Sequence, residues 1–142
     1  MSIESGIKDK LDNEPPVEVG INGLAIISQE LMETIRNAHL ALEDCVDGRG
    51  GSAALVRSGQ LLHQLGGALK LTETYGAALL AEEMEAVCAY LASLRAGKGR
   101  EDGLEALTRA MVQLPIYIER LLAGGRDIAL ELLPMQIGRA HV

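Results

Sequence analysis

The sequence predicts an all-α domain built as an antiparallel four-helix bundle, and three observations lead to this fold class. Hydrophobic residues make up 48% of the 142 residues, yet the chain has no Phe, no Trp and 3 Tyr. The remaining apolar residues (Leu, Ala, Ile, Val and Met) suit the packing of helix against helix. In four long segments these residues recur at intervals of three and four, as on one face of a helix. Short connections between such segments predict antiparallel neighbours.

The two ends of the chain differ from its middle. Residues 1–18 carry mixed charge, the Pro15-Pro16 pair and almost no apolar periodicity, so we expect a flexible N-terminal arm. The bundle is expected over residues 19–134, and residues 135–142 are interpreted as a tail or linker. A chain of this length supports one domain with its own core.

The first two helices are predicted from apolar spacing and from the turn between them. The first runs from about Ile21 to Val46 and ends before the glycine-rich turn 47–51. The second is expected to end near Leu71, and Ser52 is a suitable N-cap at its start.

The second half of the chain predicts two further long helices. One is expected over residues 74–96, closed by residues 97–99. The other begins near Glu101, and Pro115 either kinks it or begins a new helix. A possible short extra C-terminal helix is predicted over residues 127–133.

Composition restricts the partners and the location. The net charge of −7 and pI near 4.9 argue against nucleic acid, because phosphate binding needs a basic face, and against an anionic membrane surface. No apolar run approaches the ~18 residues of a spanning helix, and the N-terminus lacks a signal pattern. We therefore expect a cytoplasmic protein without membrane insertion. Cys45 and Cys88 lie in helical patterns, which favours two buried thiols over a disulfide.

The segment 52–71 contains the residue that most needs a functional explanation, His63. At ~100° per residue, His63 points roughly 130° away from the apolar face of this helix. Gly59, Gly66 and Gly67 lie on the same side as His63 and cost on the order of 1 kcal/mol each relative to alanine. They predict a low surface that the backbone of another protein could approach. The apolar face itself is formed by Leu55, Leu62, Leu65 and Leu69.

An exposed histidine on a bundle helix can act as a nucleophile toward phosphorus and pass the phosphoryl group to an aspartate of a partner. His63 is therefore a phospho-acceptor candidate, and Lys70 is a candidate cation to offset the phosphoryl charge. The alternative is an ordinary surface histidine. The surrounding candidate docking surface comprises Gly59, Gln60, Gln64, Gly66, Gly67 and Lys70.

No other group of residues predicts a second site. His39 and His141 are not expected to bind a metal, and we expect no metal site in the chain. Glu82, Glu83 and Glu85 form an acidic run that we expect to be solvated, and a contribution to partner recognition is the alternative. The chain has no glycine-rich phosphate-binding pattern, so we expect no cofactor and no self-contained active site.

The sequence HQLGGALKL, residues 63–71, resembles the histidine phosphotransfer (Hpt) motif, in which lysine follows the histidine by three residues and glycine by four. His63 and Gly67 occupy the histidine and glycine positions, and Gly66 stands where the lysine belongs. A wider resemblance covers roughly residues 52–134. The runs LLHQLGGALKLTETYGAALLAEEMEAV and LPIYIERLLAGGRDIALELLP are similar to the N-terminal Hpt-like region of the type IV pilus chemosensory kinases called ChpA or PilL, a region that the related FimL shares.

The resemblance implies a bundle of the Hpt type in a cytoplasmic signalling module that governs pilus activity and twitching motility. His63 would accept a phosphoryl group from a histidine kinase domain and deliver it to the aspartate of a response-regulator receiver domain. Since some Hpt-like domains of this family serve only as docking scaffolds, a scaffold that never carries phosphate is the alternative. A third interpretation, a dimerisation module, is less favoured because the outer helix faces are polar. The short chain fits a fragment of a longer protein, and both a free-standing protein and the front of a large kinase stay open as interpretations.

Overall fold

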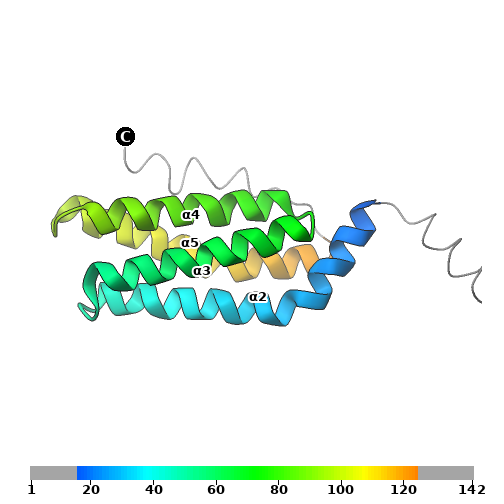
Figure 1. Cartoon of the computed structure of the whole chain (residues 1–142), viewed down its shortest axis with the longest axis horizontal. Coiled ribbons are helices and arrows are strands. Elements are labelled where there is room, and N and C mark those ends of the chain that lie inside the picture. The colour runs from blue at the N-terminus through cyan, green and yellow to red at the C-terminus, as the bar shows by residue number, and fades with distance from the viewer. Residues whose placement is uncertain (1–15, 125–142) are drawn as a thin grey trace, which may run out of the picture.

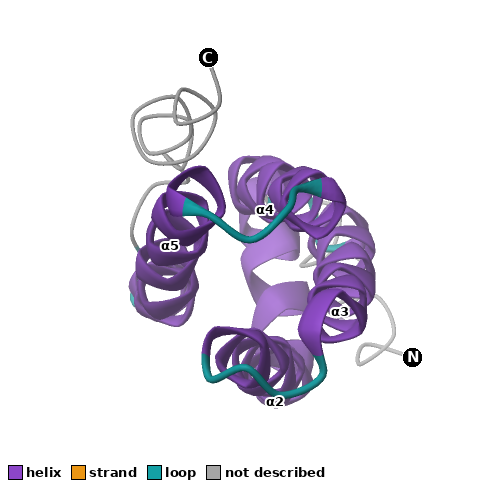
Figure 2. Cartoon of the chain, turned by 90° about the vertical axis from the view of Figure 1, so that its left-hand side faces the viewer, coloured by secondary structure: helices purple, strands orange, loops and turns teal. Residues whose placement is uncertain are grey.

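The computed structural model describes residues 16–124, with side-chain surroundings from Gly23 onward. These residues form four helices and no strand: α2 (Pro16–Val46), α3 (Gly51–Leu71), α4 (Tyr75–Ser93) and α5 (Lys98–Leu122). The helices lie side by side, and the chain reverses direction at each connection (Figure 1). Viewed from the end, α3 lies between α2 and α4, and α5 lies between α4 and α2 (Figure 2). The predicted all-helical class and the four long helices are thus confirmed for this part of the chain.

The first helix begins earlier than its apolar pattern predicts. It starts at Pro16 and not near Ile21, and it ends at Val46 as expected. Proline suits the first helical turn because its missing N–H would have no partner there. The helix therefore includes residues 16–18 of the expected arm. The rest of the arm, the predicted helix over 127–133 and the tail lie outside the described residues.

The predicted N-cap of α3 was wrong. Gly50, and not Ser52, is the N-cap, with φ of 77° in the left-handed region that glycine adopts readily. Ser52 lies inside the helix, where its hydroxyl Oγ accepts a hydrogen bond of 3.5 Å from Arg100 Nη2. The helix ends at Leu71, as the sequence predicts.

The connection from α4 to α5 also differs from the prediction. α4 ends at Ser93, before the predicted position 96, because Leu94 turns to extended backbone and packs against the core. α5 begins at Lys98 and continues through Pro115, so a new helix does not start there. Within the described range, no helix combines the length and the apolar character that crossing a membrane requires.

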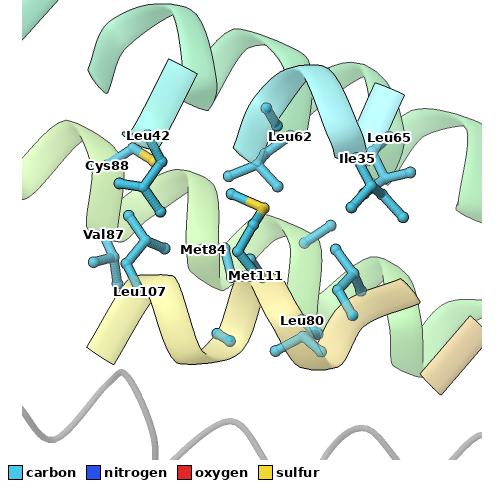
Figure 3. Close-up of a cluster of buried hydrophobic side chains, with 14 of the residues drawn as sticks. Ile35, Leu42, Leu62, Leu65, Leu80, Met84, Val87, Cys88, Leu107 and Met111 are labelled. Carbon is cyan, nitrogen blue, oxygen red and sulfur yellow. The ribbon is translucent and has the colours of Figure 1, made fainter. Parts of the chain in front are cut away.

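The core of the described residues is one cluster of side chains from all four helices, which are aliphatic or sulfur-containing except for Tyr117 (Figure 3). Leu62 of α3, Met84 of α4 and Met111 of α5 are completely buried in it. Cys45 and Cys88 are free, buried thiols, as their helical positions predicted. The helix faces that the 3.6-residue period assigns to the core are therefore the faces that meet there.

The turn between α3 and α4 is a Schellman motif that fixes how the two helices meet. The Thr74 N–H donates to the Leu69 carbonyl at 2.8 Å, and the Glu73 N–H donates to the Lys70 carbonyl at 3.0 Å. Glu73 occupies the left-handed position of the motif with φ of 59°. Glycine is the usual residue there, since it has no Cβ to clash.

We expect Glu73→Gly to stabilise the domain. The left-handed conformation costs an L-residue roughly 1–2 kcal/mol, and glycine avoids this cost. Glycine also has greater conformational freedom in the unfolded chain, which offsets part of the gain in stability. The free energy of unfolding should rise by about 0.5–1 kcal/mol in urea denaturation, with Tm higher by roughly 1–4 °C. As a control, Glu33→Gly at an exposed position within α2 should instead lose about 1 kcal/mol. A loss of stability in both variants would contradict the assigned turn.

Candidate functional site

His63 lies in the middle of α3 on the side turned away from the core. Its neighbours Leu62 and Leu65 are buried, whereas 76% of the His63 side chain is exposed. Helical spacing predicted this orientation. The imidazole is therefore open to a partner.

A carboxylate of the next helix holds the imidazole. His63 Nδ1 lies 3.1 Å from both Oε1 and Oε2 of Glu85 on α4. An ionised carboxylate only accepts hydrogen bonds, so Nδ1 carries the proton and donates a hydrogen bond to Glu85. In this tautomer Nε2 has the free lone pair. The pair thus fixes both the orientation and the chemistry of the ring.

A second pair joins the same two helices. Lys70 Nζ pairs with Glu82 Oε1, and both side chains are partly exposed. An exposed pair of this kind contributes little to stability. The pair matters for the electrostatics of the site. Lys70, which the sequence suggested as the cation beside a phosphoryl group on His63, is already paired with the carboxylate of Glu82.

The three glycines on this side of α3 have two different roles. A Cβ at Gly59 would lie 3.3 Å from Cys88 Cβ, and a Cβ at Gly66 would lie 3.7 Å from Glu82 Cγ. Both glycines are buried and let α3 and α4 approach closely. A Cβ at Gly67 would meet nothing within 4 Å. Of the three, Gly67 alone provides the open surface that the sequence suggested for all of them.

A groove of about 580 Å³ lies between α3 and α4 beside His63. Val56 and Ala89 contribute exposed apolar surface, and Gly59 and Cys88 line its buried part. Burial raises the pKa of the Cys88 thiol to about 12, so the thiol is neutral at physiological pH. The polar lining residues are Gln60, His63, Gln64 and Glu85.

The expectation that the acidic run of α4 is merely solvated was wrong for two of its residues. Glu85 and Glu82 each pair with a side chain of α3, as described above. The sequence contains a signal for the first pair. His63 and Glu85 lie at nearly equal distances along the chain from Glu73, and such residues face each other in an antiparallel helix pair. This signal predicts the pairing of His63 with Glu85 only when the register of α3 against α4 is known.

The remaining candidate groups do not join this site. His39 Nε2 lies 3.3 Å from Glu43 Oε1, one turn away on the same helix. His141 lies outside the described residues. Within residues 23–124, no three side chains of His, Cys, Asp or Glu gather closely enough to hold a metal ion.

Comparison with known proteins gives a similarity to a scaffold protein. Over 115 residues, 81% of this chain, the sequence is 30% identical to the scaffold protein FimL of Pseudomonas aeruginosa. The matched region is 20% of FimL, so the chain spans about a fifth of the length of this relative. No protein-family model matches the chain, and no solved structure matches it significantly. The expected resemblance to FimL is thereby supported, and the assignment to the ChpA or PilL kinases stays a prediction.

Proposed function

We propose that this chain is a docking module of a cytoplasmic scaffold in type IV pilus chemosensory signalling. The partner binds to what we call the His63 face, which consists of His63, Gly67 and Lys70 of α3, Glu82 and Glu85 of α4, and the adjoining groove. The similarity to a scaffold protein over 81% of the chain carries this proposal. A receiver domain or a histidine kinase domain of the same pathway is the proposed partner.

The charges on the His63 face support docking without phosphate. A phosphoryl group adds roughly two negative charges. It would stand on the ring that already contacts the Glu85 carboxylate, and a like charge within ~4–6 Å disfavours a charged group. Lys70, the cation that the described part of this face contributes, is paired with Glu82. Docking without phosphate requires no free cation to offset a phosphoryl charge.

Phosphotransfer through His63 is the second candidate, and the hydrogen bond between Nδ1 and Glu85 favours it. With the proton on Nδ1, the Nε2 lone pair can attack the γ-phosphorus of ATP held by a kinase domain, while the bond from that phosphorus to the ADP oxygen breaks and Glu85 takes the proton from Nδ1. The same Nε2–P bond would then break as a receiver aspartate takes the group. Acid-labile phosphate received from a pathway kinase, and absent from His63→Gln, is its signature.

We expect Gly67→Trp to abolish signalling. The position is open, so the indole covers the His63 face without clashing with the fold. The variant is introduced into the chromosomal gene, so that the chain is tested in the protein as the cell makes it. The measurement is twitching motility, and the expected result is a loss of most movement at an unchanged protein level.

Gly99→Trp on α5 is the matched control, because a Cβ there also meets nothing within 4 Å. It should leave motility unchanged. Normal motility in Gly67→Trp would contradict docking at the His63 face. An equal loss in both variants would contradict it as well, since position 99 lies outside that face.

A further inference from the structure

The His63 face has two carboxylates one turn apart, opposite a gap in the side chains of α3. Cβ atoms of Glu82 and Glu85, three residues apart on α4, are ~5–6 Å apart. Their side chains are 39% and 35% exposed. Between His63 and Lys70, Gly66 is buried against α4 and Gly67 faces open space, so neither position places a side chain over this part of the face. A group from outside can therefore reach the exposed parts of both carboxylates at this gap.

The charge of this face favours a cation in the gap. Glu82 and Glu85 contribute two carboxylates and Lys70 contributes one ammonium group, so the carboxylates outnumber the lysine cation of this face. A carboxylate has about four lone-pair sites, so each can accept donors beyond its present α3 partner. Arginine fits better than lysine, because its planar guanidinium carries five N–H donors in a fixed fork that can bond two carboxylates together.

The groove supplies the second element of recognition. Its lining includes Gly59, about one turn before His63, and Val56, about two turns before it. The gap at positions 66 and 67 lies about one turn after His63. Its buried lining is uncharged, and Val56 is 49% exposed. An apolar side chain of the partner would cover this surface, and the removal of both apolar surfaces from water would stabilise the complex.

From this arrangement, and resting on the proposed docking function, we infer that the His63 face recognises a partner helix carrying an arginine and an apolar side chain about two turns apart. The arginine binds Glu82 and Glu85 together, and the apolar side chain enters the groove beside Gly59. Two turns of helix span ~11 Å, which matches the separation of the two sites along α3. His63 lies between the two contacts.

The test uses synthetic helical peptides with arginine and leucine seven residues apart, in both orders, on an alanine and glutamine background. Matched peptides carry lysine or glutamate in place of arginine, or alanine in place of leucine. They are titrated into the ¹⁵N-labelled chain, and both the Kd and the shifted amide signals are recorded. We expect one order of the arginine–leucine peptide to bind at least 10-fold more tightly than the glutamate and alanine versions. It should also bind several-fold more tightly than the lysine version, with shifts at Gly59 and Gly67.

Substitutions in the chain locate the contact. Glu82→Gln and Glu85→Gln should each weaken the arginine–leucine peptide about 10-fold, whereas Glu83→Gln, on the same turn of α4, should have no effect. Equal weakening by Glu83→Gln, or equal affinity for the lysine peptide, would overturn the inference in favour of a general attraction to acidic surface. If no peptide binds while Gly67→Trp still abolishes motility, this partner chemistry is wrong and the docking function stands. If Gly67→Trp also has no effect, the docking function fails too.

Discussion

Leu62→Ala is expected to lower the free energy of unfolding by about 3–5 kcal/mol, because it leaves a cavity in the centre of the bundle. Leu62 is 0% exposed and belongs to the same buried cluster as Met84 and Met111 (Figure 3). Removing its branched end loses both the transfer free energy and the contacts around the void. Domains of this size are stable by about 5–15 kcal/mol, so the loss is a large fraction of the total.

Urea denaturation followed by circular dichroism measures this loss. The matched control is Leu40→Ala, because Leu40 is 49% exposed on α2 and its truncation should change stability by less than about 0.5 kcal/mol. A loss below about 1.5 kcal/mol for Leu62→Ala would contradict the burial of this face of α3. Because His63 follows Leu62 directly, the same result tests which way the histidine points.

Gly59→Val is expected to cost roughly 2–3 kcal/mol, because α3 and α4 touch at this glycine. The first added carbon would already lie 3.3 Å from Cys88 Cβ and 3.9 Å from the carbonyl oxygen of Glu85. The two methyl groups of valine need more room still. They would push the helices apart at the groove and weaken the pairing of His63 with Glu85.

Gly67→Val provides the matched control on the same helix. Its Cβ meets nothing within 4 Å, and valine is a better helix former than glycine, so stability should rise by a few tenths of a kcal/mol. The measurement is again the free energy of unfolding in urea. Equal effects of the two substitutions would contradict the division of the glycines into packing and surface positions.

The sequence predicted those features of the fold that depend on one helix at a time. Turn residues placed the helix ends at Val46 and Leu71 correctly, and apolar spacing placed His63 on the exposed side. The errors arose where the local sequence is compatible with more than one structure. Gly50 took the capping position that Ser52 could also fill, and Pro115 was accommodated inside α5.

The candidate site was predicted less completely, because it depends on how two helices meet. The angle of Gly59 and Gly66 around α3 placed them beside His63, but only the position of α4 shows that they face a neighbouring helix. The pairing of Glu85 with His63 and of Glu82 with Lys70 likewise requires the register of α3 against α4. A single helix cannot specify that register.

Twitching motility of a His63→Gln strain tests the central claim most directly. The glutamine amide can still donate a hydrogen bond to Glu85, so the shape and pairing of the His63 face are kept, while an amide nitrogen cannot accept a phosphoryl group. If the domain works by docking, motility stays near the wild-type level at an unchanged protein level. A loss as severe as that expected for Gly67→Trp would contradict docking without phosphate and show that the imidazole itself is required.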